Sequence, residues 1–302
     1  MSAQRMALEH YENFPVLSRF VPAELRAPFA AVYAFARVTD DIGDEIGVPP
    51  ERRLEALRRW EVAFEVEILE AGESRTEEAW RGDSGSSDHA PVLAAVARTI
   101  REHGLSLEPF RTLILANRMD QLRSRYETYA ELLDSCALSA NPVGRIVLEL
   151  LGSRDDAHLA ASDAVCTGLQ LANHWQGIGE DLRWRDRLYV PREDMARFGV
   201  REDDLRRDRP GRAVRRLVGH LVDRTRVLLE TGSALPGAFA PRHAAVLRLF
   251  TRGGLAILDE IEARQADLLR GRIRVPRRRA LWLLASEELR LAAATWSRRN
   301  GG

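Results

Sequence analysis

Carboxylates gather at the end of one predicted helix, in the stretch YAFARVTDDIGDE at residues 33–45, the first motif. Asp40 and Asp44 are four residues apart, so they lie one helical turn apart on the same side, with Asp41 beside them. Carboxylates in this register repel each other, and the helix dipole disfavours negative charge at a C-terminus. A cation relieves both penalties, and Mg²⁺ takes oxygen ligands from a few carboxylates. A solvated acidic helix end is the alternative.

The same helix face carries two further polar side chains. Tyr33 and Arg37 lie upstream of the carboxylates, aligned at helical spacing. Arginine suits bidentate contact with phosphate oxygens. The combination therefore favours a site for magnesium and a phosphorylated substrate over a plain acidic helix end.

A second polar face occurs in LANHWQGIGEDLRWRDRLYVP, residues 171–191. Steps of three, four and four residues place four positions on one helix face, beginning just before this stretch: Gln170, Asn173, Gly177 and Asp181. We call this face the second motif. Asn173 and Asp181 could supply oxygen ligands, whereas Gly177 supplies none. Glu180 points close to the same face and offers a second carboxylate. By itself, a helix end of mixed charge is the better interpretation.

Arginine and tyrosine also accompany the second motif. Arg187 and Tyr189 follow in RDRLYVP and are placed to line the rim of a site. Two acidic helix ends, each associated with Arg and Tyr, are less readily explained as solvated surface than either end alone. The pair favours two halves of one metal-dependent phosphate site.

The elements that position these residues are predicted to be helices. Apolar residues recur at helical spacing, and alternating β-branched runs are scarce. The predicted helices cover the stretch from Pro22 through the first motif, then 51–70, 91–103, 107–125, 128–151, 155–181, 211–231, 240–270 and 277–297. The stretch 71–90 is polar and Gly/Ser-rich and is predicted to be a flexible loop. We expect one all-α domain, residues 1–302, with long helices around a central cavity.

Composition narrows the functional classes. The 302 residues include 45 basic and 45 acidic ones, so a net charge of zero gives no pull toward nucleic acid. Cys136 and Cys166 lie in apolar helical patterns without a CxxC partner, as expected of reduced core residues. The N-terminus lacks the apolar core of a signal peptide, and no apolar stretch is long enough to span a membrane. These features predict a cytoplasmic protein, and peripheral contact with the inner face of a membrane is compatible with them.

Three other features have less specific interpretations. His174 lies about 100° around the helix from Asn173, so we expect it to face the packing and not a metal. The basic run RIRVPRRR, 272–279, could contact diphosphate or anionic lipid, although such runs are more often solvated loops. The apolar stripe of residues 280–296 is expected to dock on the domain and not on a membrane.

Four stretches together resemble a known family. They are ENFPVLSRFVP, YAFARVTDDIGDE, RYETYAELLDSCALSANPVGR and LQLANHWQGIGEDLRWRDRLYVPREDMARFGV. In this order they resemble the squalene/phytoene synthase family over roughly residues 8–285 of the chain. The ENFPV opening, SANPVG and HWQ are most similar to its hydroxysqualene synthase branch, which serves bacterial squalene and hopanoid synthesis.

The resemblance implies an all-α isoprenoid (terpenoid) synthase fold in which two aspartate-rich motifs face each other across a cavity and Mg²⁺ bridges them to a diphosphate. Positions matching catalytic residues are Arg37, Asp40, Asp44 and Asp181. Positions matching the metal site are Asp40, Asp41, Asp44, Asn173 and Asp181, with Glu180 as the nearest stand-in for a missing acid. Positions matching substrate-binding residues are Asn13, Tyr33, Arg37, Gln170, Asn173, Arg187 and Tyr189.

The resemblance also implies a reaction. The branch converts presqualene diphosphate to hydroxysqualene with loss of diphosphate, and it works with a presqualene-forming partner enzyme. Two positions depart from the family pattern, since Gly177 replaces an Asp and Ser135 replaces a Tyr. Three interpretations follow: a magnesium-dependent hydroxysqualene synthase, a synthase that condenses farnesyl diphosphate head to head, or a non-catalytic prenyl-binding member of the family.

Overall fold

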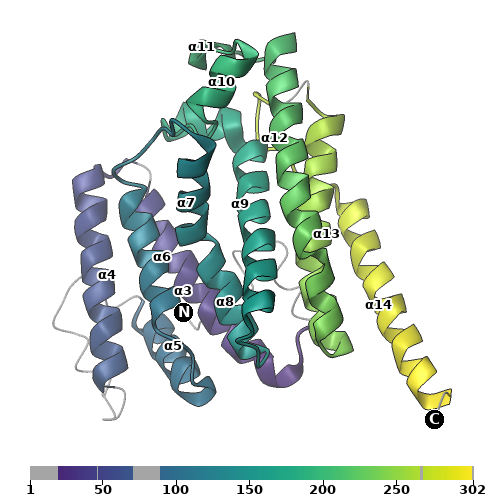
Figure 1. Ribbon diagram of the computed structural model, residues 1–302. Coiled ribbons are helices and arrows are strands. Elements are labelled where there is room, and N and C mark those ends of the chain that lie inside the picture. Colours follow the sequence, from purple (N-terminus) through teal and green to yellow (C-terminus); the bar gives the residue numbers. More distant parts are fainter. Residues whose placement is uncertain (1–19, 46, 71–88, 266–267, 301–302) are drawn as a thin grey trace. The chain divides into compact units, whose positions relative to one another are not determined.

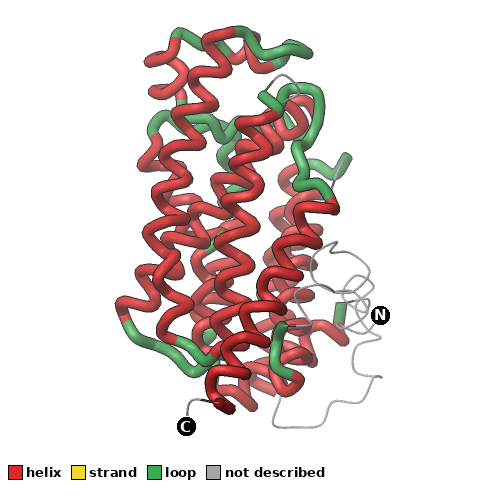
Figure 2. The backbone as a smooth tube through the Cα atoms, turned by 90° about the vertical axis from the view of Figure 1, so that its right-hand side faces the viewer, coloured by secondary structure: helices red, strands yellow, loops and turns green. Residues whose placement is uncertain are grey.

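The computed structural model describes residues 20–45, 47–70, 89–265 and 268–300, which form helices and connecting loops (Figures 1 and 2). Within these ranges, the β-type pairing is limited to an isolated bridge between Arg125 and Leu188. The predicted all-α class is therefore confirmed. No helix in the described ranges combines the length and the apolar character needed to cross a membrane. Asn13 and most of the predicted 71–90 loop lie outside the described residues.

The chain divides into two compact units. One comprises Met1–Arg123 with Pro142–Arg154, and the other comprises Ser124–Asn141 with Asp155–Gly302. The first motif belongs to the first unit and the second motif to the second. A single domain around a central cavity stays a prediction.

The first unit is built around α3 (Arg26–Asp44), which follows the short 3₁₀ helix η1 (Ala23–Leu25). α3 packs against α4 (Pro50–Glu70), α5 (Ala90–His103) and α6 (Glu108–Met119). Ala31, Phe35 and Val38 are buried at helical spacing and turn one face of α3 inward. The Phe35 ring centre lies 5.5 Å from that of Trp60 and 5.4 Å from that of Phe110. This aromatic core fixes the helix whose far end carries the first motif.

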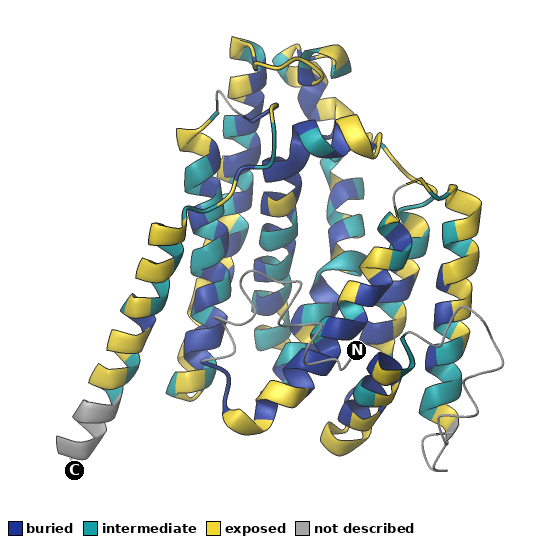
Figure 3. Cartoon of the chain, turned by 180° about the vertical axis from the view of Figure 1, so that it is seen from behind, coloured by how far each residue is buried: buried dark blue, intermediate teal, exposed yellow. Residues whose placement is uncertain are grey.

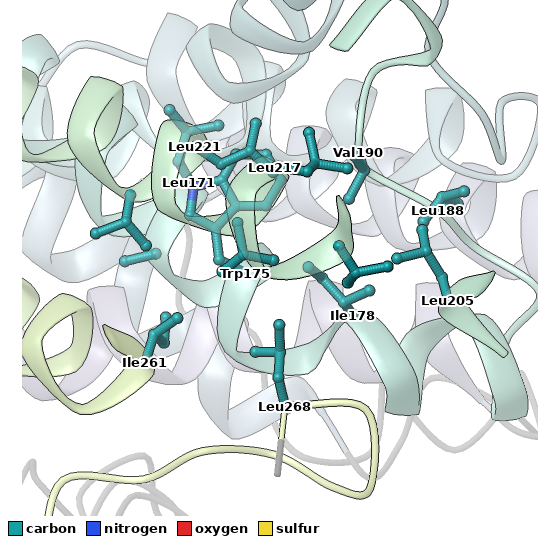
Figure 4. Packing of buried hydrophobic residues seen from close by; sticks show 14 of the residues in the cluster. Leu171, Trp175, Ile178, Leu188, Val190, Leu205, Leu217, Leu221, Ile261 and Leu268 are labelled. Atoms are coloured by element: carbon teal, nitrogen blue, oxygen red, sulfur yellow. The ribbon is translucent and has the colours of Figure 1, made fainter. Parts of the chain in front are cut away.

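The second unit is built around α9 (Asp156–Trp184), which begins where the Asp155 carboxylate accepts hydrogen bonds from two backbone N–H groups. α9 packs against α12 (Arg212–Thr231), α13 (Pro241–Ala263), α7 (Tyr129–Ser139) and η3 (Gly232–Ala238). Figure 4 shows Trp175 of α9 beside Leu217 and Leu221 of α12. The Trp175 indole also donates to Thr225 on α12 over 2.8 Å. This core fixes the orientation of the second motif.

Three predicted helices differ from the observed ones. The helix expected at 107–125 ends at Met119. The single helix expected at 128–151 is interrupted at Ala140, and α8 (Asn141–Leu150) begins with Pro142 in its first turn, where the missing N–H costs nothing. The helix expected at 240–270 ends at Ala263. Residues 268–271 form a turn and a bend, and residues 272–276 have no regular secondary structure. In this last stretch the backbone N–H of Ile273 donates to the Gln176 carbonyl of α9. The short helices α10 (Arg192–Phe198) and α11 (Glu202–Leu205) follow the second motif.

The last helix, α14 (Arg277–Asn300), packs against α13 as expected. Its anchor is Glu287, which is fully buried and accepts hydrogen bonds from Arg248 and Arg252 of α13. The opposite side of α14 is exposed (Figure 3), and it includes Leu281 and Trp282. The apolar stripe of this helix is therefore only partly docked, since Leu281, Trp282 and Leu289 are exposed.

Candidate functional site

The first motif occupies the last turns of α3. Among the described residues, no hydrogen bond joins Arg37 to Asp40 or Asp44. Its Nε donates to Asp41 Oδ2 over 3.1 Å, in an exposed pair four residues apart. Such pairs are worth only about 0.3–0.5 kcal/mol, so a phosphate group could compete for the guanidinium at little cost.

The carboxylate of Asp40 has a neutral hydrogen-bond donor. Among the described residues this donor is Asn117 Nδ2, 3.0 Å from Oδ1. Asp40 is exposed at the surface, but many protein atoms surround its carboxyl group. This partial removal from water raises the pKa of the carboxyl to about 6. The charges of Asp44 and Asp41 act in the same direction, whereas the Asn117 bond and Arg37 oppose them. A cation placed here would stabilise the ionised form.

Asn117 is a site residue that the sequence analysis missed. It lies on α6 four residues after Leu113, and Gln121 follows four residues later in the turn after the helix. Gln121 Nε2 donates to the Gly43 carbonyl over 3.0 Å and so satisfies a group at the exposed end of α3. Gly43 lets the two helices approach, because a Cβ there would lie 2.5 Å from the Asn117 side-chain oxygen. The sequence signal that could have identified Asn117 is the spacing of four residues that links the apolar Leu113 to the amides of Asn117 and Gln121.

The second motif lies on α9, and arginine side chains engage its oxygen atoms. Asp181 is buried, and its Oδ1 accepts from Arg185 Nη1 over 2.8 Å. Burial raises the pKa of Asp181, and Arg185 counteracts this rise. The side-chain oxygen of Asn173 accepts a hydrogen bond from Arg272. Glu180 Oε2 lies 3.9 Å from Arg272 Nη1, so this stand-in acid faces the same guanidinium.

Arg272 opens the basic run 272–279, which the sequence left open between a contact with diphosphate or anionic lipid and a solvated loop. The solvated-loop interpretation is wrong for Arg272, because its guanidinium reaches the face of α9 that carries Gly177. A Cβ at Gly177 would lie 2.8 Å from Arg272 Nη1 and 2.8 Å from Asp181 Oδ2. The glycine thus leaves room for a guanidinium. Arg279 of the same run pairs with Asp259 and Glu260.

Aromatic rings pack beside the second motif. His174 is buried and stacks on Tyr189 with ring centres 3.7 Å apart. Burial lowers the pKa of His174 to about 3, and the positive charges of Arg272 and Arg187 act in the same direction. The ring therefore stays neutral. Its burial and its stacking on Tyr189 confirm that His174 faces the packing. Tyr126 also stacks on Tyr189, with ring centres 6.0 Å apart.

Ser135 stands where the family resemblance implies a tyrosine. Its hydroxyl lies 2.9 Å from the hydroxyl of the buried Tyr126, and the two are hydrogen-bonded. A phenol is thus present near this position, contributed by residue 126 and oriented by the serine.

The chain after α9 is held in place by an ionic network. Asp186 has a left-handed backbone, with φ of 51°, and Arg125 donates to its carboxylate over 2.8 Å. Arg125 also bonds both oxygens of Glu202. Arg187, which follows this turn, is buried, and Tyr189 is half-buried. The structure thus assembles Asn173, Asp181, Arg187 and Tyr189 within one unit, while the first motif lies in the other unit.

Comparisons with known proteins identify the family. A family model described as squalene/phytoene synthase matches residues 8–279. The chain belongs to this family. A hydroxysqualene synthase from Sinorhizobium fredii is 33% identical over 230 residues, which cover 76% of this chain and 72% of that protein. The crystal structure of squalene synthase HpnC from Alicyclobacillus acidocaldarius is 42% identical, with a TM-score of 0.75, and the match covers 86% of this chain and 92% of that one.

A dehydrosqualene synthase structure with a ligand shares the fold at 21% identity, with a TM-score of 0.82 and coverage of 96% of this chain and 95% of that chain. The chain therefore has the isoprenoid synthase fold that the motifs predicted. Members of the squalene/phytoene synthase family are prenyltransferase-type enzymes that act on prenyl diphosphates and generally depend on a metal.

The two motifs fit a divalent metal unequally. On α3, the Asp40 carboxylate accepts a hydrogen bond from the neutral amide of Asn117, which adds no positive charge. A bound cation would supply that charge and stabilise the ionised form. On α9, Asn173 and Asp181 already accept from arginines. Within the described ranges, no three His, Cys, Asp or Glu side chains converge to form a metal site by themselves. A metal at the first motif would need further ligands from substrate or water.

Proposed function

We propose that this chain converts presqualene diphosphate to hydroxysqualene and diphosphate. The observation that carries the proposal is the similarity to relatives named hydroxysqualene synthase, which extends over about three quarters of the chain. The acidic face of α3 and the arginines beside α9 supply the groups that such a reaction needs. A second candidate is head-to-head condensation of farnesyl diphosphate, and the 42% identity to a squalene synthase of known structure favours it.

The proposed reaction is balanced without a redox partner. The bond between carbon and the diphosphate oxygen breaks with both electrons leaving on diphosphate. The remaining carbocation rearranges, water adds its oxygen, and one proton is released. The protein must therefore stabilise the departing diphosphate and limit access of water to the cation.

We assign the residues to these tasks as follows. Asp40 and Asp44, with Asp41 beside them, would hold a divalent cation, which when bound neutralises charge on the diphosphate. Arg37 would exchange its weak contact with Asp41 for phosphate oxygens. Asn173, Gln170 and Tyr33 would contribute polar contacts with the substrate.

The second motif has a different electrostatic character. Because Asn173 and Asp181 accept hydrogen bonds from arginines, we assign no metal to α9. His174 is neutral and buried, so it is suited to support the Tyr189 ring and not to transfer protons. Tyr189 is the half-buried ring of this stack, and its π system can stabilise positive charge, whereas Tyr126 is buried.

The test is incubation of the purified protein with Mg²⁺ and presqualene diphosphate, and separately with farnesyl diphosphate, with products identified by mass spectrometry. We expect hydroxysqualene from the first substrate. Consumption of farnesyl diphosphate with presqualene diphosphate untouched would favour the second candidate. Binding of both substrates without turnover would indicate a non-catalytic member of the family.

A further inference from the structure

Arg272 occupies the space that Gly177 leaves on α9. The guanidinium donates to the Asn173 side chain, one turn before the glycine, and lies 3.9 Å from Glu180. A Cβ at position 177 would lie 2.8 Å from Arg272 Nη1, closer than unbonded heavy atoms normally come. Any side chain at position 177 would therefore require the Arg272 guanidinium to shift from the position it holds.

The position of Arg272 is built into the backbone around it. The Gln176 side chain donates to the Ile273 carbonyl, and the Ile273 N–H donates to the Gln176 carbonyl, both over 3.1 Å. Leu269 and Ile273 are fully buried on either side of Arg272. A second glycine, Gly179, allows this segment to approach, because a Cβ there would overlap the Leu269 carbonyl oxygen. The guanidinium is thus held by a docked segment and not by a freely moving loop.

The charges on this part of α9 are already balanced. Asp181 is bonded to Arg185, and Glu180 faces Arg272, so two acids meet two guanidinium groups. The Asn173 bond and the Glu180 pair engage only part of the five N–H donors of Arg272. An arginine held in this way, with donors not used by the described residues, is suited to bidentate contact with phosphate oxygens.

We propose that the Arg272 guanidinium is the resident cation of the second motif, taking the place that a divalent metal would hold if residue 177 were acidic. Metal binding is then confined to the first motif, and α9 presents to the diphosphate a cation that is part of the chain. This inference rests on the proposed function insofar as it takes a diphosphate as the ligand.

The experiment counts bound Mn²⁺ by electron paramagnetic resonance in the presence of inorganic pyrophosphate, and measures pyrophosphate affinity by calorimetry. In Arg272→Gln, pyrophosphate should bind about 10- to 100-fold more weakly, the range expected for loss of charge-assisted hydrogen bonds. Gly177→Asp alone should also weaken pyrophosphate binding, because the new carboxylate pairs with Arg272, and it should gain no Mn²⁺. The double variant, Gly177→Asp with Arg272→Gln, should bind one more Mn²⁺ than the natural chain.

Two further variants locate the metal. Asp40→Asn should lower the number of bound Mn²⁺ ions in the natural chain, whereas Asp181→Asn should lower it only when Gly177→Asp and Arg272→Gln are also present. Arg278→Gln removes one charge from an exposed position in the same basic run and serves as the matched control. Arg272→Lys keeps the charge and should retain part of the affinity. Thermal unfolding of each variant separates loss of binding from loss of fold.

The proposal is overturned if Asp181→Asn in the natural chain loses a bound Mn²⁺, if Arg272→Gln binds pyrophosphate as tightly as Arg278→Gln does, or if the natural chain binds no pyrophosphate. None of these readouts requires turnover. If the chain binds pyrophosphate and Mn²⁺ as expected but leaves presqualene diphosphate unchanged, the proposed function fails and the assignment of Arg272 stands.

Discussion

Asp40 and Asp181 show how the same residue type acquires different roles from its neighbours. Burial raises the pKa of both carboxyls, but Asp181 is bonded to Arg185, whereas the donor to Asp40 is the neutral amide of Asn117. The first site therefore favours an additional cation more strongly. Sequence spacing located both acids, but it could not show which one already has a positive partner.

Asn117 provides the first prediction at the residue scale. In Asn117→Ala, loss of the hydrogen bond should raise the pKa of Asp40 further, because this bond favours the ionised form. The dissociation constant for Mn²⁺ near pH 7 should increase about three- to tenfold, as expected for one hydrogen bond to a charged group. The control is Leu115→Ala, an exposed change on the same helix. Equal Mn²⁺ affinity in both variants would rule out a role for Asn117 in supporting Asp40.

His174 provides a prediction about pH. The pKa of this buried ring is about 3 in the folded protein, below the ordinary value of 6.5. Below pH 6.5 the unfolded chain takes up a proton that the folded chain does not, so stability is lost as pH falls toward 3. Near pH 4.5 this residue should lower the free energy of unfolding by about 2–3 kcal/mol relative to pH 7.5.

The measurement is urea unfolding of the natural chain and of His174→Phe, which keeps a ring against Tyr189, across this pH range. The variant should lose less stability on acidification, while His103→Phe at an exposed position should behave as the natural chain does. Parallel losses in all three proteins would contradict a buried neutral His174.

At the scale of elements, periodicity located the long helices but not where the chain leaves them. The helix expected at 240–270 ends at Ala263, although apolar residues continue beyond it. Leu268 and Leu269 lie in a turn after α13 and Ile273 in the irregular stretch that follows, and all three are buried in the core around α9, so their apolar character reflects contact with another helix. Tertiary packing determined this boundary, and one sequence does not contain the position of the partner helix.

Gly179 tests whether the segment after α13 depends on close approach to α9. In Gly179→Ala the added methyl group would overlap the Leu269 carbonyl, so we expect the free energy of unfolding to fall by about 1–3 kcal/mol. Gly253→Ala, in α13, has open space around the new methyl group and should instead stabilise the protein by up to about 1 kcal/mol. Chemical denaturation measures both. Stabilisation by Gly179→Ala would show that the segment does not dock as observed.

At the scale of the whole molecule, the fold class and the family were predictable from the sequence because several motifs occur in order. The contact between Arg272 and Asn173 could not be predicted from the sequence, since it joins residues 99 positions apart and depends on how the segment after α13 packs. Gly177 was recognised as a missing ligand. The structure adds that the chain itself supplies a cation beside it.

The whole chain must also exclude water until diphosphate has left and then admit one water to the cation. The most direct test of the proposed reaction is therefore turnover of presqualene diphosphate by the purified protein with Mg²⁺ in ¹⁸O-labelled water, with the product analysed by mass spectrometry. The proposed function predicts hydroxysqualene with one ¹⁸O atom in its hydroxyl group. Unchanged presqualene diphosphate, or a product whose oxygen is unlabelled, would contradict it.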